Sequence, residues 1–420
     1  MRDGDTIAAI STAPGRGGVA VVRVSGPDAW EVARKVTGRQ IAASCAGRFF
    51  FCDFGGADSG LLLVFKAPHS YTGEDAVELQ CHGGSVAPRR VLEACFAAGA
   101  RLARRGEFTE RAFLNGKLDL SAAEAVIDLV DARTDRAAED AQARLRGALS
   151  ARYESLYGAA LGLSSRLEHM LDVDEGELPP GALEDVARDV AALVLQIETL
   201  LATAHEGRLL REGALVVLAG APNAGKSSLM NALLGERRAI VSDEAGTTRD
   251  TIEEGLDVDG WPVRLVDTAG LRDASNAVEA EGVRRAGEQI GRADMVIALD
   301  CDIPGAMRIH AKCDLDDDAT HLRVSAKTGE GLDALKAAIA KRLGEIAGTS
   351  SECGAAGDVT ARQVSLLEAA KSALSGADVG EPVLAANALR RAAEALGEIV
   401  GKTYSADLLN AIFSRFCVGK

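Results

Sequence analysis

One segment constrains the fold of this chain more than any other. An apolar run at residues 215–219 is followed by Gly220-Ala-Pro-Asn-Ala-Gly225-Lys226-Ser227, and a helix-forming stretch begins at Ser228. A strand, a glycine-rich turn and a helix in this order direct main-chain N–H groups and the positive end of a helix toward a phosphate. In the spacing G-x-x-x-x-G-K-S, the lysine reaches the β- and γ-phosphates and the serine hydroxyl suits Mg²⁺. The predicted nucleotide contacts of this loop are Asn223, Ala224, Gly225, Lys226, Ser227 and Ser228.

Two polar segments predict the loops that sense the γ-phosphate. An apolar strand ends in Asp267-Thr268-Ala269-Gly270, which places a carboxylate near the magnesium ion and a glycine amide near the γ-phosphate. Between this strand and the phosphate loop lies Gly246-Thr247-Thr248, and Thr248 is the expected second magnesium ligand beside Ser227. Loops of this kind are ordered by the γ-phosphate and released after hydrolysis.

The expected base-reading residues follow downstream. Lys312-Cys-Asp314 is similar to the end of the guanine motif N-K-x-D, in which the aspartate accepts two N–H donors that adenine does not offer. Ser325-Ala326-Lys327 follows a short strand and is similar to the loop whose main chain meets the guanine oxygen. The order and spacing of these motifs predict a GTPase domain.

Two departures from the usual GTPase pattern affect this domain. Ala311 stands where the guanine motif has asparagine. Because a lost neutral hydrogen bond costs about 0.5–1.5 kcal/mol, we expect weaker nucleotide binding rather than loss of function. The strand-like segments 295–300 and 307–310 are separated only by residues 301–306, although a parallel crossover normally takes about a dozen residues or more. We therefore expect this sheet edge to be rearranged or loosely ordered.

Helical sequence stands on both sides of the GTPase segment, which predicts an inserted domain whose flanks pack together. The predicted segments are an α/β N-terminal domain at 1–118, the first part of a helical domain at 119–212, an inserted Ras-like P-loop GTPase domain at 213–346, and the second part of the helical domain at 347–420. Strands are expected at 19–24 and 60–65, and helices at 91–98 and 183–201. The fold class is therefore multidomain, combining α/β with all-α structure.

Composition excludes several classes of protein. The chain has 47 basic and 62 acidic side chains, a net charge of −15, which disfavours a protein coated by nucleic acid. A basic cluster at Arg101, Arg104 and Arg105 is compatible with RNA contact or with a solvated surface. No apolar run approaches the roughly 18 residues of a membrane span. Eight scattered cysteines without a Cys-x-x-Cys pair argue against a zinc site or a disulfide framework and fit the cytoplasm.

Taken together, the motifs resemble the MnmE (TrmE) family of tRNA-modification GTPases over nearly the whole chain. Besides the GTPase motifs, the resemblance is carried by segments 5–7, 14–19, 71–75, 78–84 and 106–115 and by the terminal Phe416-Cys417-Val418-Gly419-Lys420. It implies a tetrahydrofolate-binding N-terminal domain that forms a homodimer. It also implies a flavoprotein partner, MnmG (GidA), with which the family forms a 5-carboxymethylaminomethyl or aminomethyl group on the wobble uridine, position 34, of certain tRNAs.

The resemblance further implies a folate site. By position, its residues are Arg23, Glu78, Lys117 and Lys420, whose charges suit the glutamate tail and the pterin N–H donors of a 5-formyl- or 5,10-methylene-tetrahydrofolate. Cys417 resembles the reactive thiol proposed for the family, although a lone cysteine is more often a buried apolar residue.

In the GTPase domain, the resemblance adds a potassium ion and a catalytic glutamate. The K⁺ ligands would be Asn223, Ser242, Glu244 and Thr247, within a cation loop that comprises Ser242, Asp243, Glu244, Ala245, Gly246 and Thr247. The cation would take the place of an arginine finger and neutralise charge on the transferring phosphoryl group. Glu279 resembles the residue of the family that orients the attacking water.

Three other functions stay open at this point. A P-loop ATPase is disfavoured by Asp314 and the loop at Ser325. A GTP-switched scaffold, such as a ribosome-assembly GTPase, shares the GTPase motifs but does not require the N-terminal segment or the terminal C-x-G-K. A folate enzyme with merely regulatory GTP is compatible with the N-terminal segment.

Overall fold

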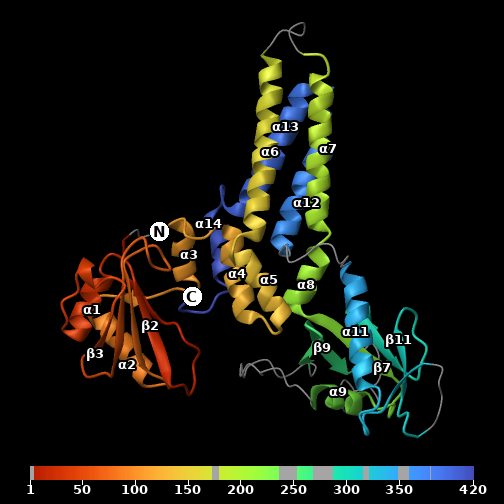
Figure 1. Cartoon of the computed structure of the whole chain (residues 1–420), viewed down its shortest axis with the longest axis horizontal. Helices are drawn as coiled ribbons and strands as arrows, with labels where there is room; N and C mark the ends of the chain where they lie inside the picture. Colours follow the sequence, from red (N-terminus) through yellow and green to blue (C-terminus); the bar gives the residue numbers. More distant parts are fainter. Residues whose placement is uncertain are drawn as a thin grey trace, which may run out of the picture. The chain divides into compact units, whose positions relative to one another are not determined.

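The chain folds into two compact units, one made of Met1–Ile127 and Gly397–Lys420 and the other of Asp128–Leu396. The structure is a computed structural model that describes residues 4–172, 179–235, 253–267, 287–315, 321–348, 359–378 and 380–420. The first unit therefore joins the two ends of the chain, and the second unit contains most of the helical sequence together with the phosphate-loop segment (Figure 1).

A six-stranded sheet with the order β3-β4-β5-β2-β1-β6 forms the core of the first unit. Neighbouring strands of this sheet are antiparallel, except β1 and β6, which are parallel. The strands are β1 (Ile7–Ile10), β2 (Val19–Ser25), β3 (Phe49–Asp53), β4 (Ser59–Phe65), β5 (Ala76–His82) and β6 (Arg101–Leu102). The helices are α1 (Ala29–Thr37), the 3₁₀ turn η1 (Ala43–Cys45), α2 (Ala87–Ala97), α3 (Glu107–Leu114) and α14 (Ala406–Phe413).

The two faces of this sheet differ because successive residues of a strand point to opposite sides. One face is apolar and packs against α1 and α2; its buried side chains include Val22, Val24, Leu62, Val77 and Leu79. The other face carries Arg23 and Glu78, which are direct cross-strand partners. Helix α3 packs on part of this second face, where Ile7, Ala9, Ala103 and Phe108 form a small buried cluster.

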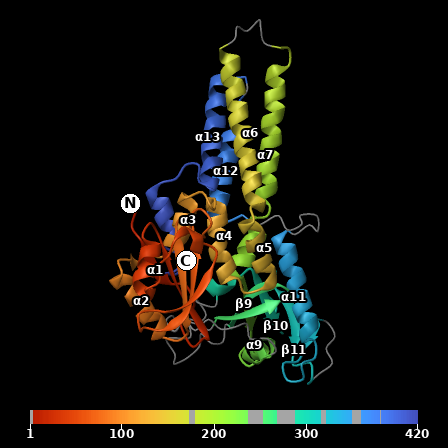
Figure 2. The ribbon, with the colours of Figure 1, turned by 60° about the vertical axis from the view of Figure 1, so that its left-hand side comes forward.

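Helices of 9 to 24 residues make up the helical part of the chain. They are α4 (Leu120–Asp131), α5 (Asp135–Leu145), α6 (Ala148–Leu171), α7 (Ala182–Leu201), α8 (Ala204–Glu212), α12 (Ala361–Ser375) and α13 (Pro382–Val400). Helices α6, α7, α12 and α13 lie side by side in a bundle (Figures 1 and 2). Tyr153 of α6 donates a 3.0 Å hydrogen bond to Gln363 at the start of α12, which joins segments more than two hundred positions apart. The predicted amphipathic helix is α7, whose buried residues are Val186, Val190, Leu193, Ile197 and Leu200.

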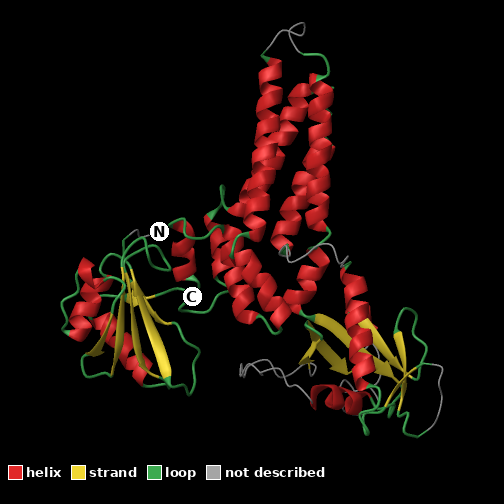
Figure 3. Ribbon diagram, viewed as in Figure 1, coloured by secondary structure: helices red, strands yellow, loops and turns green. Residues whose placement is uncertain are grey.

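The strand before the phosphate loop belongs to a second sheet, whose strands are drawn in yellow in Figure 3. This sheet has six strands in the order β12-β11-β10-β7-β9-β8. Only β8 is antiparallel to its neighbour. The elements are β7 (Ala214–Gly220), α9 (Lys226–Gly235), β8 (Glu253–Val258), β9 (Trp261–Asp267), β10 (Met295–Leu299), β11 (Met307–Ala311), β12 (Leu322–Val324) and α11 (Leu332–Ala347). The carboxyl ends of parallel strands are where such sheets bind ligands.

At the edge of this sheet the crossover helix is absent from residues 300–306, as predicted, but the expected rearrangement of the strands is wrong. Strand β11 pairs with β10 in parallel, with Met307 opposite Ile297 and Ile309 opposite Leu299. Strand β11 begins opposite the middle of β10. The connection from the end of β10 to the start of β11 therefore runs back along the strand direction by only about two residues, or roughly 7 Å at about 3.3 Å per residue. The connection at 300–306 covers this distance without a helix.

The fold class predicted from the sequence is confirmed, with α/β structure at the N-terminus, a P-loop sheet and a helical part divided along the chain. The strands expected at 19–24 and 60–65 are β2 and β4, and the helix expected at 91–98 lies largely within α2. Among the helices of the described residues, none is long and apolar enough to cross a membrane. The exact limits of the four predicted segments stay a prediction.

Candidate functional site

The phosphate loop lies between the end of β7 and the start of α9. A Cβ atom at Gly220 would lie only 2.8 Å from the main-chain oxygen of Leu299, so this position requires glycine. Asn223 and Gly225 both have positive φ angles, +64° and +100°, which shape the turn before the helix. The Lys226 side chain is buried, and its Nζ donates 2.9 Å hydrogen bonds to the main-chain oxygens of Gly220 and Ala221. The ammonium group therefore lies over its own loop, where a phosphate would bind.

Two predicted magnesium-site residues face each other beside this loop. Ser227 Oγ, in the first turn of α9, donates a 2.5 Å hydrogen bond to Asp267 Oδ2 at the end of β9. A hydroxyl and a carboxylate are the hard oxygen donors that Mg²⁺ binds together with nucleotide phosphates. The described residues hold no group of three or more His, Cys, Asp or Glu side chains arranged for a metal. The Ser227 hydroxyl and the Asp267 carboxylate fit a magnesium ion, and Thr248, the other predicted ligand, lies outside the described residues.

The guanine-side residues line a cavity of about 270 Å³ next to the phosphate loop. Lys312 Nζ donates a 2.6 Å hydrogen bond to the main-chain oxygen of Asn223, and Ser325 Oγ donates a 2.7 Å hydrogen bond to Asp314 Oδ1. The hydrogen bond from Ser325 lowers the pKa of Asp314, which keeps this carboxylate an acceptor. The cavity is lined by Ala224, Gly225, Ser228, Leu229, Ala311, Lys312, Asp314, Leu315, Val324, Ser325, Ala326 and Lys327. The structure thus brings the two predicted base-reading segments to one cavity.

The remaining predicted residues of the GTPase domain lie outside the described residues. They are Ser242, Asp243, Glu244, Ala245, Gly246, Thr247, Thr248, Thr268, Ala269, Gly270 and Glu279. Their assigned roles stay predictions.

A second pocket lies on the sheet face of the first unit. Arg23 contacts Glu78 through Nε and Nη2, at 3.0 and 2.9 Å from Oε1. The Arg23 guanidinium also lies 5.2 Å from the centre of the Tyr71 ring and 5.6 Å from that of Phe108, which are cation–π distances. The cavity measures about 100 Å³ and is lined by Arg23, Phe65, Ser70, Tyr71, Thr72, Ala76 and Glu78.

Lys117 and the C-terminal segment contact two different segments near this pocket. Lys117 Nζ donates a 3.1 Å hydrogen bond to Pro68 O, on the loop that also carries Tyr71. The main-chain oxygen of Lys420 accepts a 3.3 Å hydrogen bond from Phe108 N, at the start of α3. Cys417 is exposed, and its main-chain oxygen accepts a 3.3 Å hydrogen bond from Gly106 N. Arg23 and Glu78 are therefore in direct contact, whereas Lys117 and Lys420 are held on neighbouring segments.

Gly419 explains how the C-terminal segment approaches β1. Its φ angle is +100°, and a Cβ atom there would lie 2.2 Å from the main-chain oxygen of Ile10. Only glycine fits this position, so the glycine of the C-x-G-K motif has a structural reason.

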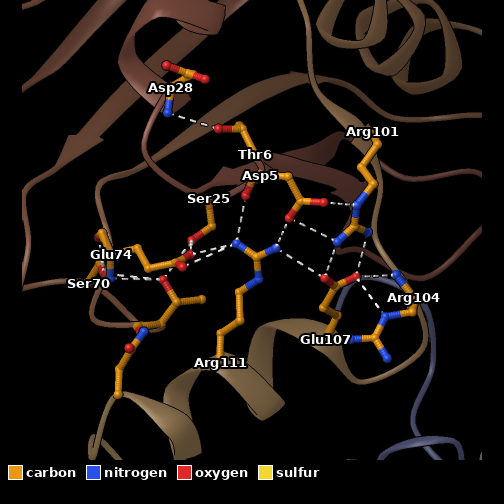
Figure 4. Close-up of polar contacts among 12 residues, drawn as sticks. Asp5, Thr6, Ser25, Asp28, Ser70, Glu74, Arg101, Arg104, Glu107 and Arg111 are labelled. Atoms are coloured by element: carbon orange, nitrogen blue, oxygen red, sulfur yellow. Dashed lines mark hydrogen bonds and ion pairs between the residues drawn. The ribbon is translucent and has the colours of Figure 1, made fainter. Parts of the chain in front are cut away.

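Two arginines of the predicted basic cluster, Arg101 and Arg104, belong to an ion-pair network (Figure 4), whereas Arg105 donates a 3.0 Å hydrogen bond to the main-chain oxygen of Phe416. Glu107 is only 2% exposed and accepts hydrogen bonds from Arg101, the Arg104 amide and Arg111. Burial alone would raise the pKa of Glu107, but these hydrogen bonds outweigh it and lower the pKa to about 2. Arg101 and Arg111 also contact Asp5 at 2.5 and 2.8 Å. This network was not predicted from the sequence, although the spacing of Glu107 and Arg111 at i,i+4 in one short helix is a signal for it.

The observed geometry defines a class of protein before any comparison. A strand, a phosphate loop with a buried lysine, a serine–aspartate pair and a guanine-side cavity together make a P-loop domain of the GTPase type. The same chain carries a charged pocket in its first unit.

Comparisons with known proteins indicate the same family along nearly the whole chain. A family described as "MnmE helical domain" matches residues 120–417, and one described as "GTP-binding protein TrmE N-terminus" matches residues 6–117. The protein named "tRNA modification GTPase MnmE" of Alkalilimnicola ehrlichii is 44% identical over 443 residues, with 99% of each chain covered. The proteins of that name from Symbiobacterium thermophilum and Neisseria meningitidis serogroup B are 42% and 43% identical, again with 99% of each chain covered. Among solved structures, the G domain of the T. maritima FeoB iron transporter is 25% identical, covers 32% of this chain and 98% of its own, and has a TM-score of 0.23.

The chain belongs to the MnmE family of tRNA modification GTPases. It is accordingly an enzyme that hydrolyses GTP.

Proposed function

We propose that the chain is a potassium-activated GTPase that acts with the flavoprotein MnmG to form the 5-carboxymethylaminomethyl or aminomethyl group on wobble uridine 34 of certain tRNAs, using a folate one-carbon unit. One observation carries this proposal: a GTPase-type site and the Arg23–Glu78 pocket, with the C-terminal C-x-G-K segment docked beside it, occur in one chain. A GTP-switched scaffold would need only the first of these. We place the reaction in the cytoplasm, where tRNA is available.

In the GTPase site, the chain's own residues bind and orient the nucleotide. Lys226 would exchange its two main-chain acceptors for phosphate oxygens, since these acceptors belong to the loop that surrounds the phosphate. Ser227 and Thr248 would hold Mg²⁺ with Asp267 beside them, and the ion neutralises charge on the β- and γ-phosphates when bound. Asp314 would accept the two N–H donors of guanine, and the loop at Ser325 would present main-chain N–H groups to its oxygen.

The potassium ion and the water-orienting group rest on residues around this site. Asn223, which has a positive φ angle within the phosphate loop, would offer its side-chain oxygen to K⁺. Ser242, Glu244 and Thr247 would complete the ligands, and Glu279 would orient the attacking water. A cation there neutralises developing charge without an arginine from a partner protein.

In the first unit, the pocket chemistry suits a reduced folate. Glu78 offers a carboxylate for the pterin N–H donors, and Tyr71 offers an aromatic ring for stacking. Lys117 and Lys420 would add positive charge for the glutamate tail of the folate, and Cys417 is exposed on the same docked segment. We therefore assign 5-formyl- or 5,10-methylene-tetrahydrofolate to this pocket.

The uncovered part of the N-terminal sheet supports a homodimer. Phe49 and Phe51 of β3 are 71% and 73% exposed, and Leu61 of β4 lies directly opposite Phe51. Cross-strand register places these side chains on the same face as Arg23 and Glu78. An exposed apolar surface of this kind marks a protein–protein contact, here with a second copy of the chain. Sedimentation should show a dimer that Phe51→Ser converts to monomer; an unaltered dimer would place the interface elsewhere.

The proposed function is tested by mass spectrometry of tRNA nucleosides. Cells that lack the gene should lose the modified wobble uridine, and the wild-type gene should restore it. Lys226→Ala should fail to restore it because the phosphate contact is lost, whereas Asp302→Ala, which alters an exposed ion pair with Arg308, should succeed. Unchanged wobble uridines in the deletion strain would contradict the proposal and favour the scaffold.

A further inference from the structure

Asp300 contacts β11 through its side chain at the point where the main chain leaves the sheet. It follows β10 directly and has a φ angle of +51°, which turns the chain away from the strand direction. Its main-chain N still donates a 3.2 Å hydrogen bond to Ile309 O. Two residues further along β11, the Asp300 side chain makes the next contact. Asp300 Oδ1 accepts a 3.2 Å hydrogen bond from Ala311 N. His310 Nδ1 lies 2.9 Å from the same oxygen.

Ala311 is the residue at which the guanine motif begins. Its side chain is 9% exposed and lines the guanine-side cavity, and it replaces the asparagine amide of the usual motif. The next residue, Lys312, has a φ angle of +60°, so the chain turns sharply there before it reaches Asp314. A shift of the Ala311 main chain would therefore be passed on to the carboxylate that is to read the base.

We propose that Asp300 is a positioning residue for base recognition, which holds the guanine loop from the β10 side in place of the absent side-chain anchor at position 311. This inference rests on the proposed reading of guanine by Asp314. Two contacts support it from opposite sides of the loop: Asp300 holds its first residue, and Ser325 holds Asp314 itself. Asp302, two positions later, instead forms an ion pair with the partly exposed Arg308.

The test measures the affinities of the full-length protein for GDP and IDP. Inosine lacks the 2-amino group of guanine, so the ratio of the two affinities reports contact between Asp314 and that group. We expect Asp300→Ala to weaken GDP binding by about tenfold and to reduce the preference for GDP over IDP, since a buried donor is left without its acceptor. Asp300→Asn keeps an oxygen acceptor and should retain the preference. Asp302→Ala is the matched control and should bind like wild type.

Two further variants keep the inference falsifiable. Asp300→Glu keeps the charge but displaces the acceptor by one methylene, so it should lower the GDP/IDP ratio even if Asp300→Ala does not fold. Adding Ala311→Asn to Asp300→Ala should recover part of the lost preference, because it supplies the missing anchor. An unchanged GDP/IDP ratio in Asp300→Glu, or in a folded Asp300→Ala, would overturn the inference.

Asp314→Asn separates this inference from the assignment on which it rests. If Asp314→Asn removes the preference for guanine while the Asp300 variants do not, the base-reading assignment stands and the positioning role of Asp300 is wrong. If Asp314→Asn binds GDP and IDP as wild type does, both are wrong.

Discussion

Lys312 Nζ donates a 2.6 Å hydrogen bond to the main-chain oxygen of Asn223, which joins the guanine loop to the phosphate loop across 89 positions of sequence. The asparagine that the guanine motif normally has at position 311 would connect the same two loops, and Ala311 cannot make that contact. In the structure the neighbouring lysine makes a contact between the same two loops. The loss of one amide therefore leaves the two halves of the nucleotide cavity connected.

Restoring the amide at position 311 should still strengthen nucleotide binding. We predict micromolar or weaker affinity for GTP in the wild type, where a Kd near 1 μM corresponds to about −8.2 kcal/mol. Ala311→Asn should tighten binding by up to about tenfold, since one added hydrogen bond contributes at most roughly 1.4 kcal/mol. Titration with a fluorescent GTP analogue measures both proteins. Nanomolar binding by the wild type, or no gain in the variant, would mean that Lys312 and Asp300 already hold the loop fully.

GTP turnover should depend on the identity of the monovalent cation. We expect faster hydrolysis in potassium than in sodium or lithium at matched ionic strength, because the ion must fit a site that includes the Asn223 oxygen. Asn223→Ala should remove most of this difference. Equal rates in all three salts would exclude the cation from the mechanism.

Glu279 should act on the reaction and not on binding. We predict that Glu279→Ala slows hydrolysis by a factor on the order of 10²–10⁴, the scale for loss of a positioned acid–base or water-orienting group. The affinity for GTP should barely change, because the carboxylate addresses the attacking water. Glu281→Ala is the neighbouring control and should keep near-normal turnover. A parallel fall in GTP affinity in Glu279→Ala would indicate a structural role.

The pocket of the first unit should lose folate when its charges are removed. Arg23→Ala and Glu78→Ala should each weaken binding of 5-formyl-tetrahydrofolate by about tenfold or more, since each leaves the partner of an ion pair uncompensated. Arg34→Ala removes an exposed ion pair with Glu31 on α1 and serves as the control. Calorimetric titration measures all four proteins. Full affinity in both pocket variants would place the folate elsewhere.

Glu107 should make the first unit sensitive to acid. Its pKa of about 2 lies below the ordinary 4.5, so its contribution to stability is present above about pH 4.5 and is lost as the pH falls toward 2. At about 1.4 kcal/mol per pKa unit, Glu107→Gln should lower the free energy of unfolding by about 3 kcal/mol at pH 7. Its deficit relative to the parent should shrink below pH 4.5.

Tryptophan fluorescence can follow this unit alone. The chain has two tryptophans, so a Trp261→Phe background leaves Trp30 of α1 as the reporter. Urea unfolding of this background with and without Glu107→Gln gives the difference at each pH. A deficit that stays constant from pH 7 to pH 3 would contradict the role of the Glu107 charge.

Local sequence determined the elements whose signals are periodic or consecutive. The phosphate loop follows from a strand, a glycine turn and a helix in one continuous segment, and α7 follows from apolar residues spaced by three and four. The opposite faces of β2, with Val22 and Val24 buried and Arg23 turned away, follow from alternation along a single strand. In each case the residues that decide the outcome lie within one or two dozen positions of each other.

Tertiary structure alone decided the contacts between distant segments. The short connection between β10 and β11 suffices because the strands are offset, and register is set by pairing across the sheet. From the sequence alone, Arg101 and Arg104 are compatible with an RNA-binding surface, but in the structure they form ion pairs with Asp5, Glu107 and Glu110. Likewise, neither Lys312 beside Asn223 nor Asp300 beside Ala311 has a local signal. Such pairs form because packing brings together the strands and loops to which the two residues belong. The sequence shows which polar groups are available, but it does not show which of them will be in contact.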